Sequence, residues 1–80
     1  MEAKLNITYS GSNGDLIDMI SYDLSDSEIR RIATEAVASG SVPGIAATNP
    51  DFSDFVIERF GATDVRPFPL ISVRPKTPFG

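Results

Sequence analysis

Carboxylates come closest to forming a chemical pattern in this chain. Four of them cluster over residues 15–26, namely Asp15, Asp18, Asp23 and Asp26. Carboxylate oxygens suit a hard cation, but this spacing does not match a calcium-binding loop. The alternation of a strand would place Asp15 and Asp23 on one face and Asp18 on the other, so we expect a solvated surface and no metal site. Asp18 has apolar neighbours and is the one to test for burial.

A second acidic group, formed by Asp51, Asp54 and Glu58, is spaced i, i+3, i+7 and would line one side of a helix. Two carboxylates act as general acid and base only where a cleft separates their pKa values. The 80-residue chain has no His and no Cys, which removes Ser-His and Cys-His pairs, the common zinc sites and an imidazole base. We expect no enzyme and no cofactor, and an exposed acidic face open to a partner.

The C-terminal residues favour binding over catalysis. Residues 1–58 carry three basic and ten acidic side chains, whereas residues 59–80 carry four basic ones and one acidic one. Prolines favour an extended conformation that binds at a low entropic cost, and a late aromatic side chain suits an interface anchor. The candidate partner-binding residues are Arg74, Pro75, Lys76, Pro78, Phe79 and Gly80.

Charge and hydropathy limit the partners. A net charge of -4 argues against general nucleic-acid binding. The chain has no apolar segment long enough for a membrane span and no signal-peptide pattern, so we expect no membrane contact and a cytoplasmic location. A domain of 80 residues buries a modest share of its surface, and binding to another protein or self-association would add stability.

Alternating apolar residues predict a strand over residues 3–10. The tetrapeptide Gly11-Ser12-Asn13-Gly14 follows, and its Asn-Gly pair indicates a hairpin turn. A second strand is predicted over residues 15–24, with a β-bulge near Ile20 and Ser21 because the alternation changes face there.

The strongest helix signal begins at Ser25, which is a good N-cap with Glu28 three residues later. Leu24 and Ile29 fit a hydrophobic staple around this start, and Gly40 stands where a left-handed residue would end the helix. The face laid on the hairpin should contain Ile29, Ile32, Ala33, Ala36 and Val37.

Residues 50–60 predict a short second helix, because Asn49-Pro50-Asp51 suits a helix start and the phenylalanines at 52, 55 and 60 follow at helical spacing. We expect these three rings in the core. The alternative is a strand over residues 54–58, which are rich in β-branched and aromatic side chains. A final strand is predicted over residues 69–74, preceded by Pro67 and Pro69.

The expected fold is a single α+β domain over residues 1–74, with an N-terminal hairpin, one main amphipathic helix, a short second helix or turn, a C-terminal strand and an extended tail over residues 75–80. The stretches LNITYSGSNGDLIDMISYDLSDSEI, GSVPGI and FSDFVIERFGATDVRPFPLISVRP resemble, in their order, the ubiquitin-like β-grasp family. The resemblance implies a β-grasp-like ββαβ arrangement in which the first and last strands lie side by side and parallel. The stretch between the helix and the last strand is short and interrupted by proline, so we expect as few as three strands.

The residue patterns and this resemblance together lead to three functional hypotheses. The first is a small non-catalytic interaction module or adaptor that docks through its C-terminal strand edge and tail. The second is a ubiquitin-like modifier or sulphur carrier activated at Gly80, although Phe79 stands where such proteins have a glycine. The third is an acidic inhibitor or antitoxin-like protein that presents its N-terminal part to a basic site.

Overall fold

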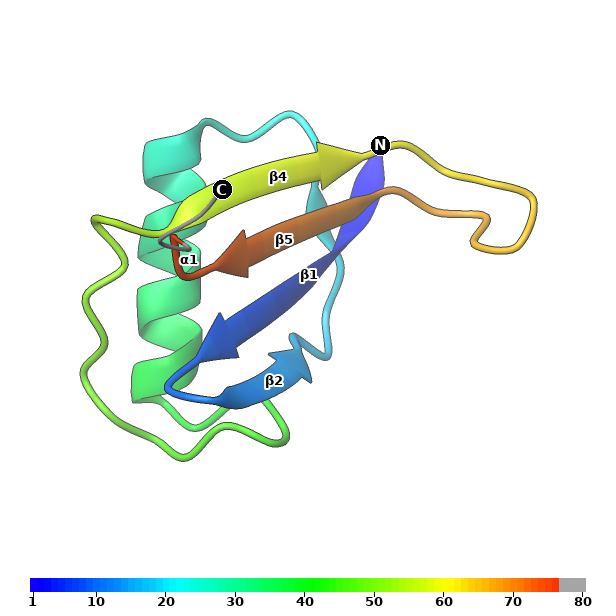
Figure 1. Cartoon of the computed structure of the whole chain (residues 1–80). Coiled ribbons are helices and arrows are strands. Elements are labelled where there is room, and N and C mark those ends of the chain that lie inside the picture. The colour runs from blue at the N-terminus through cyan, green and yellow to red at the C-terminus, as the bar shows by residue number, and fades with distance from the viewer. Residues whose placement is uncertain (77–80) are drawn as a thin grey trace.

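The computed structural model describes residues 1–76 and shows a small α+β fold, in which one helix packs on one face of a mixed five-stranded sheet (Figure 1). The elements in chain order are β1 (Glu2–Tyr9), β2 (Ser12–Asp15), β3 (Ile20–Ser21), α1 (Asp26–Ala38), β4 (Val56–Phe60) and β5 (Leu70–Arg74). The strand order is β2-β1-β5-β4, and β3 pairs with β1. β1 and β5 are parallel, while the other pairs are antiparallel. The expectation of as few as three strands is therefore wrong.

The first hairpin turns earlier than predicted. Ser10 and Gly11 have φ values of 51° and 81°, the two positive values that a tight hairpin turn requires. Asn13 and Gly14 lie within β2 and not in the turn. Gly14 serves a different purpose, because a Cβ atom at this position would collide with the carbonyl oxygen of Pro43 in the connector after α1. The connector backbone therefore packs directly on β2.

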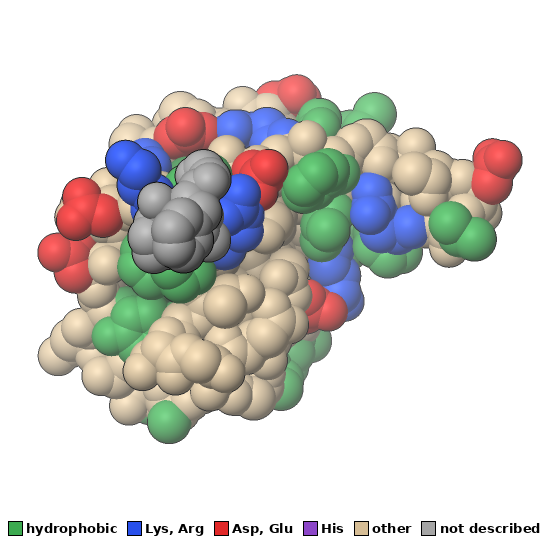
Figure 2. Space-filling view, viewed as in Figure 1, with side chains coloured by type: hydrophobic (Ala, Val, Ile, Leu, Met, Phe, Trp, Pro, Cys, Tyr) green, Lys and Arg blue, Asp and Glu red, His purple; other side chains and the backbone are tan. Residues whose placement is uncertain are grey.

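Polar side chains hold β2 to β1 on the face away from the helix. The amides of Asn6 and Asn13 exchange hydrogen bonds of 3.0 and 2.9 Å. Asn6 also donates to Asp15 Oδ1 at 2.7 Å, and Asn13 donates to Thr8 Oγ1 at 2.8 Å. Figure 2 shows this face, whose central part carries few hydrophobic or charged side chains. β2 contributes no large apolar side chain to the core, so this ladder replaces apolar packing.

The predicted strand over residues 15–24 is interrupted. β2 ends at Asp15, and the next residue, Leu16, still donates its N–H to the Leu5 carbonyl at 2.9 Å. The chain then leaves β1 and pairs with it again at β3, where Ile20 and Ser21 lie opposite Ala3 and Glu2. A break between two short strands accounts for the change of face, and no continuous bulged strand is present at these residues.

The helix prediction is confirmed. The Glu28 N–H donates to Ser25 Oγ at 3.3 Å, and this hydroxyl donates to Glu28 Oε1 at 3.0 Å. At the other end, Gly40 has a φ of 72°, its N–H donates to the Val37 carbonyl, and the Ser41 N–H donates to the Ala36 carbonyl. These two bonds form the Schellman motif that glycine permits at a helix end.

The core lies between α1 and the two central strands. β1 contributes Leu5 and Ile7, β5 contributes Ile71 and Val73, and all four side chains are fully buried. The side chains of α1 that pack against them are Ile29, Ala33, Ala36 and Val37. The strand predicted over residues 69–74 is confirmed as β5 and occupies a central position in the sheet.

The prediction of a second helix over residues 50–60 is wrong. Phe52 is only 2% exposed because its ring fills the core beside Tyr9, with the ring centroids 5.6 Å apart. The Phe55 N–H donates to the Phe52 carbonyl at 3.0 Å, which closes a turn, and β4 then begins at Val56. The rival strand reading was closer, although β4 starts two residues later. Phe60 lies at the end of β4 and is 43% exposed, so it is not a core residue.

We predict that Gly14→Ala lowers the free energy of unfolding by about 1–3 kcal/mol, because the added methyl group forces the connector away from β2. Urea denaturation followed by circular dichroism would measure this change. Gly61→Ala is the matched control, since a Cβ atom there meets nothing within 4 Å. Equal stability of the two variants would contradict the close approach at Gly14.

Candidate functional site

Three of the predicted binding residues lie in the described part of the chain. Arg74 ends β5, and Pro75 and Lys76 follow it. The predictions for Pro78, Phe79 and Gly80 lie outside the described residues. The Arg74 Nε donates to Glu58 Oε1 on β4, so this guanidinium takes part in a cross-strand ion pair.

Docking on the edge of the C-terminal strand is ruled out by the topology. β5 lies between β1 and β4, and both of its sides are hydrogen-bonded. The free edge near the C-terminal residues belongs instead to β4, with which no other strand pairs within residues 1–76.

One hydrogen bond fixes the direction of the peptide groups in β5. The Lys4 N–H donates to the Pro69 carbonyl at 3.0 Å, so residue 69 turns its carbonyl toward β1. The peptide groups of successive strand residues point to opposite sides. Leu70, Ser72 and Arg74 therefore direct their N–H and C=O groups toward β4.

The same alternation identifies the free groups of β4. Its residues Phe60, Glu58 and Val56 pair with Leu70, Ser72 and Arg74 and use their N–H and C=O groups in those pairs. The N–H and C=O groups of Ile57 and Arg59 consequently point outward along the edge. These are the groups that a further strand would pair with.

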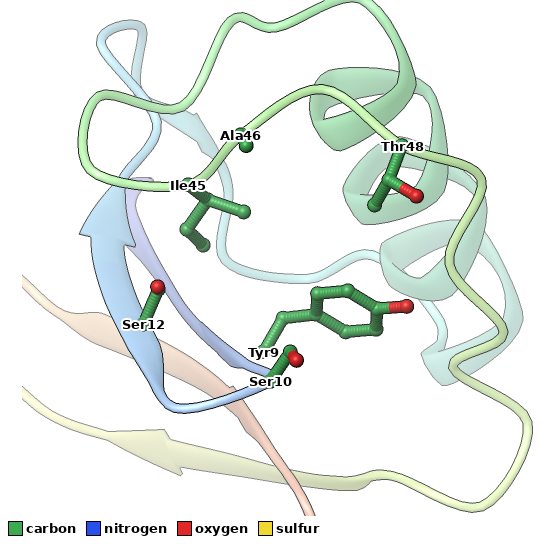
Figure 3. A pocket seen from close by; sticks show the side chains of 6 residues that line it. All are labelled: Tyr9, Ser10, Ser12, Ile45, Ala46 and Thr48. Atoms are coloured by element: carbon green, nitrogen blue, oxygen red, sulfur yellow. The ribbon is translucent and has the colours of Figure 1, made fainter.

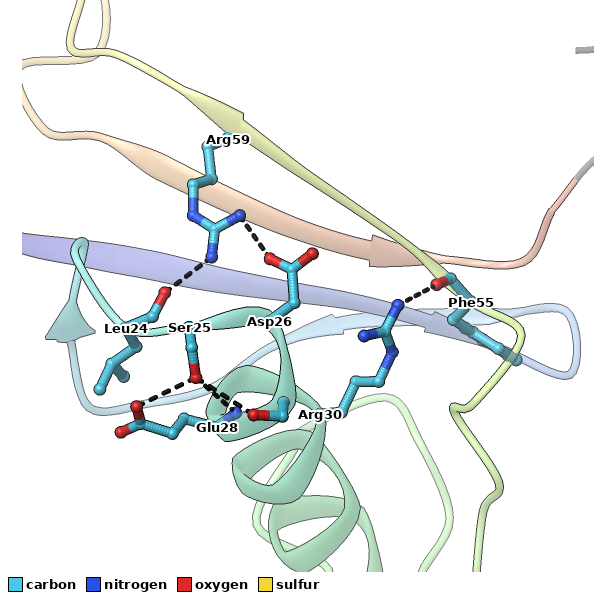
Figure 4. A network of polar contacts seen from close by, with 8 residues as sticks. Leu24, Ser25, Asp26, Glu28, Arg30, Phe55 and Arg59 are labelled. Atoms are coloured by element: carbon cyan, nitrogen blue, oxygen red, sulfur yellow. Dashed lines mark hydrogen bonds and ion pairs between the residues drawn. The ribbon is translucent and has the colours of Figure 1, made fainter.

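Two arginines connect this edge to α1 (Figure 4). Arg30 donates from Nη2 to the Phe55 carbonyl at 3.0 Å and from Nε to the Phe52 carbonyl at 3.2 Å. Arg59 donates to the Leu24 carbonyl and to Asp26 Oδ1, both at 2.7 Å. The outward N–H and C=O groups of Ile57 therefore lie between Phe55, which Arg30 holds, and Arg59, which is bonded to Leu24 and Asp26.

A groove of about 690 Å³ lies between α1 and the start of β4. Its apolar part comes from Phe55, Val56 and Ile57. Its polar lining residues are Asp26, Arg30, Ser53, Asp54 and Lys76. The groove therefore adjoins the free edge and combines an apolar strip with charges of both signs.

The structure separates the carboxylates that the sequence grouped. Asp54 lines the groove, Glu58 pairs with Arg74 on the open face of the sheet, and Asp51 accepts the Ser53 N–H at 2.9 Å. The predicted row along one helix face is therefore wrong. The hydrogen bond from the Ser53 N–H lowers the pKa of Asp51, because it favours the charged carboxylate.

The four aspartates over residues 15–26 also do not converge. Asp18 is exposed, and Asp26 pairs with Arg59. In the described part of the chain, no group of three or more acidic, His or Cys side chains could hold a metal ion. None of the helices over residues 1–76 has the length and apolar character needed to cross a bilayer.

A second hollow, of about 310 Å³, lies between the first turn and the connector (Figure 3). Hydroxyl groups of Tyr9, Ser10, Ser12 and Thr48 surround it, with Ile45 and Ala46 beside them. The ring of Tyr9 packs on Phe52 and Phe55. This lining holds no carboxylate and no cation, so it lacks the paired charges that an acid-base mechanism uses.

In comparisons with known proteins, no family model, no curated protein and no solved structure matches this chain.

We predict that Arg30→Lys lowers the free energy of unfolding by about 1–2 kcal/mol, because an ammonium group cannot donate to both carbonyls in the same geometry. Hydrogen exchange of the Phe55 amide, which donates to the Phe52 carbonyl, should also accelerate. Arg31→Lys is the control on the next residue, where the guanidinium makes only an exposed pair with Glu35. Similar losses in both variants would contradict the role of Arg30.

We also predict the pH response of the turn at Asp51. The pKa of its carboxyl in the folded chain lies below the ordinary value of 3.8, so the hydrogen bond to Ser53 contributes stability above that value. The contribution is lost as the pH falls through the lowered pKa. NMR titration of the Ser53 amide should show a midpoint below 3.8, and Asp51→Asn should abolish the transition. A midpoint at or above 3.8 would contradict this account.

Proposed function

We propose that this chain is a small non-catalytic protein-protein interaction module, which binds an extended segment of a partner by strand addition to β4. The observation that carries the proposal is the outward direction of the Ile57 and Arg59 peptide groups beside the groove. Main-chain hydrogen bonds supply affinity in this mode of binding, and side-chain pockets supply specificity.

We further propose a β-grasp-like architecture for the module. Support comes from the hairpin at the start, the single helix packed on the sheet over residues 1–76, and the parallel pairing of the first and last strands. The role suits a fold that exposes one face of its sheet and the edge of β4. It also replaces the edge of β5, which the sequence suggested, with the edge of β4.

The charges on β4 favour a different protein over a second copy of the chain. Two β4 strands could pair in antiparallel fashion so that the outward groups of both Ile57 and Arg59 form hydrogen bonds. Ile57 of one copy would then face Arg59 of the other, and the pairing would centre on Glu58. The two Glu58 side chains would lie opposite each other, and like charges in that position are destabilising. Charged residues on edge strands are a known protection against self-pairing.

The groove suggests what the bound segment contains. Side chains on one side of an added strand would enter the groove and contact Phe55 and Ile57, so apolar residues are expected at alternate positions. Asp54 and Lys76 line the groove and would favour side chains of opposite charge in the bound segment.

Hydrogen exchange tests the geometry before any partner is known. We predict that the Ile57 and Arg59 amides exchange rapidly in the free protein, whereas the Glu58 and Phe60 amides are protected by β5. Addition of a heptapeptide selected from a phage library of alternating apolar and polar residues should protect Ile57 and Arg59. Selected peptides that leave both amides unprotected would contradict strand addition.

Chemical synthesis offers a sharper form of this test. We predict that replacing the Arg59 amide by an ester lowers the affinity for the selected peptide by about threefold to tenfold, the equivalent of one hydrogen bond. The Arg59 side chain stays in place in this variant. The same replacement at Ala47, an exposed residue of the connector, is the control. An unchanged affinity in the Arg59 ester would contradict the proposal.

A further inference from the structure

The loop between β4 and β5 is longer than the fold requires. These strands are antiparallel and their last pair is Phe60 with Leu70, so a two-residue turn could join them. Residues 61–69 instead form a projection that extends beyond the end of the sheet (Figure 1). Binding residues are found disproportionately on loops that a rigid scaffold positions.

The outer part of this loop has an internal structure. The Thr63 N–H donates to the Arg66 carbonyl at 2.7 Å, and the Arg66 N–H donates to Thr63 Oγ1 at 3.0 Å. These bonds close a narrow tip that consists of Asp64 and Val65. The tip is therefore fixed without a contribution from the hydrophobic core.

The side chain of Arg66 joins the two arms of the loop. Its Nη2 donates to the Gly61 carbonyl at 2.6 Å on the first arm, and its Nε donates to the Phe68 carbonyl at 2.9 Å on the second arm. Pro67 and Pro69 restrict the second arm further, since each has a fixed φ. A loop bridged in this way loses little conformational entropy on binding.

The fixed tip presents an apolar group to solvent. Val65 is 95% exposed, which makes it the most exposed large hydrophobic side chain of residues 1–76, and the adjacent Asp64 is also exposed. Figure 2 shows the projection with acidic and hydrophobic groups at its outer end. A convex, ordered loop with a valine at its tip is complementary to a small apolar hollow.

We propose that residues 61–69 are a preformed binding loop, which inserts Val65 into an apolar pocket of a folded protein and places Asp64 against a basic rim of that pocket. The loop occupies the opposite end of β4 from the groove that Lys76 lines, so the inference is independent of strand addition. A lipid surface fits less well, because Asp64 accompanies the single apolar side chain and an acidic group is unfavourable at an anionic membrane.

Photo-crosslinking can identify the pocket. The full chain would carry benzoylphenylalanine at position 65 and be irradiated in a lysate of its native cells, with the same label at Ile17, another exposed apolar residue, as the control. The protein crosslinked only from position 65 would then be purified, and its affinity measured for the unlabelled chain and its variants.

We expect Val65→Ala to weaken that complex by about fivefold to thirtyfold and Val65→Asp to weaken it by more than a hundredfold. Ile17→Ala should leave the affinity unchanged. Arg66→Lys keeps the positive charge but loses the bridge between the two arms, so it should weaken the complex and also raise the backbone mobility of residues 63–66 in NMR relaxation. Circular dichroism would confirm that each variant is folded.

Several outcomes would overturn the inference. They are crosslinks from position 65 to a second copy of this chain alone, the absence of any crosslinked protein, and an affinity that does not respond to Val65→Asp. Val65-dependent binding to vesicles of phosphatidylcholine and phosphatidylserine, without a protein partner, would assign the loop to a membrane surface instead.

Discussion

The parallel pairing of β1 with β5 is the interaction on which the rest of the structure depends. It brings Leu5, Ile7, Ile71 and Val73 into one buried strip, and α1 packs on that strip. Burial of such apolar side chains is the main favourable term for a domain of this size. The same pairing determines which peptide groups of β5 point toward β4, and so which groups of β4 remain free at the edge. The core and the candidate site therefore both depend on the pairing of β1 with β5.

Arginine side chains stabilise the irregular segments that this small core cannot cover. Arg30, Arg59 and Arg66 each donate to at least one backbone carbonyl, and the segments they hold are the turn before β4, the start of α1 and the loop after β4. The planar guanidinium can satisfy two acceptors at fixed angles, which an ammonium group cannot. Their positions explain how β4 keeps its place although, within residues 1–76, only β5 pairs with it.

Local signals in the sequence predicted the helix and the last strand, because the caps at Ser25 and Gly40 and the apolar run before Arg74 act over a few residues. They failed at residues 50–60, where helical spacing of the aromatic side chains matched a helix, but burial of Phe52 against Tyr9 imposes a turn and a strand. Tertiary packing overrode local preference there. The turn was displaced for a similar reason, since Gly14 is required by the contact with Pro43 and not by its own backbone angle.

The candidate site was beyond the reach of these local signals. Whether a strand lies at an edge depends on the order of the whole sheet, and the sequence assigned the free edge to β5 when it belongs to β4. The β-branched residues Val56 and Ile57 indicated a strand but not its position. The order of the loop was equally hidden, because Arg66 reads as an ordinary surface cation until its contacts with Gly61 and Phe68 are seen.

The position of β5 in the middle of the sheet also has a consequence for biosynthesis. β1 is synthesised before its parallel partner β5, which is completed only at Arg74. Until then β1 can pair only with the short strands β2 and β3, and half of the buried strip does not exist. Contacts between residues so distant in sequence slow folding. The growing chain consequently lacks the β5 side of this buried strip until Arg74 has left the exit tunnel, and the native sheet assembles only then.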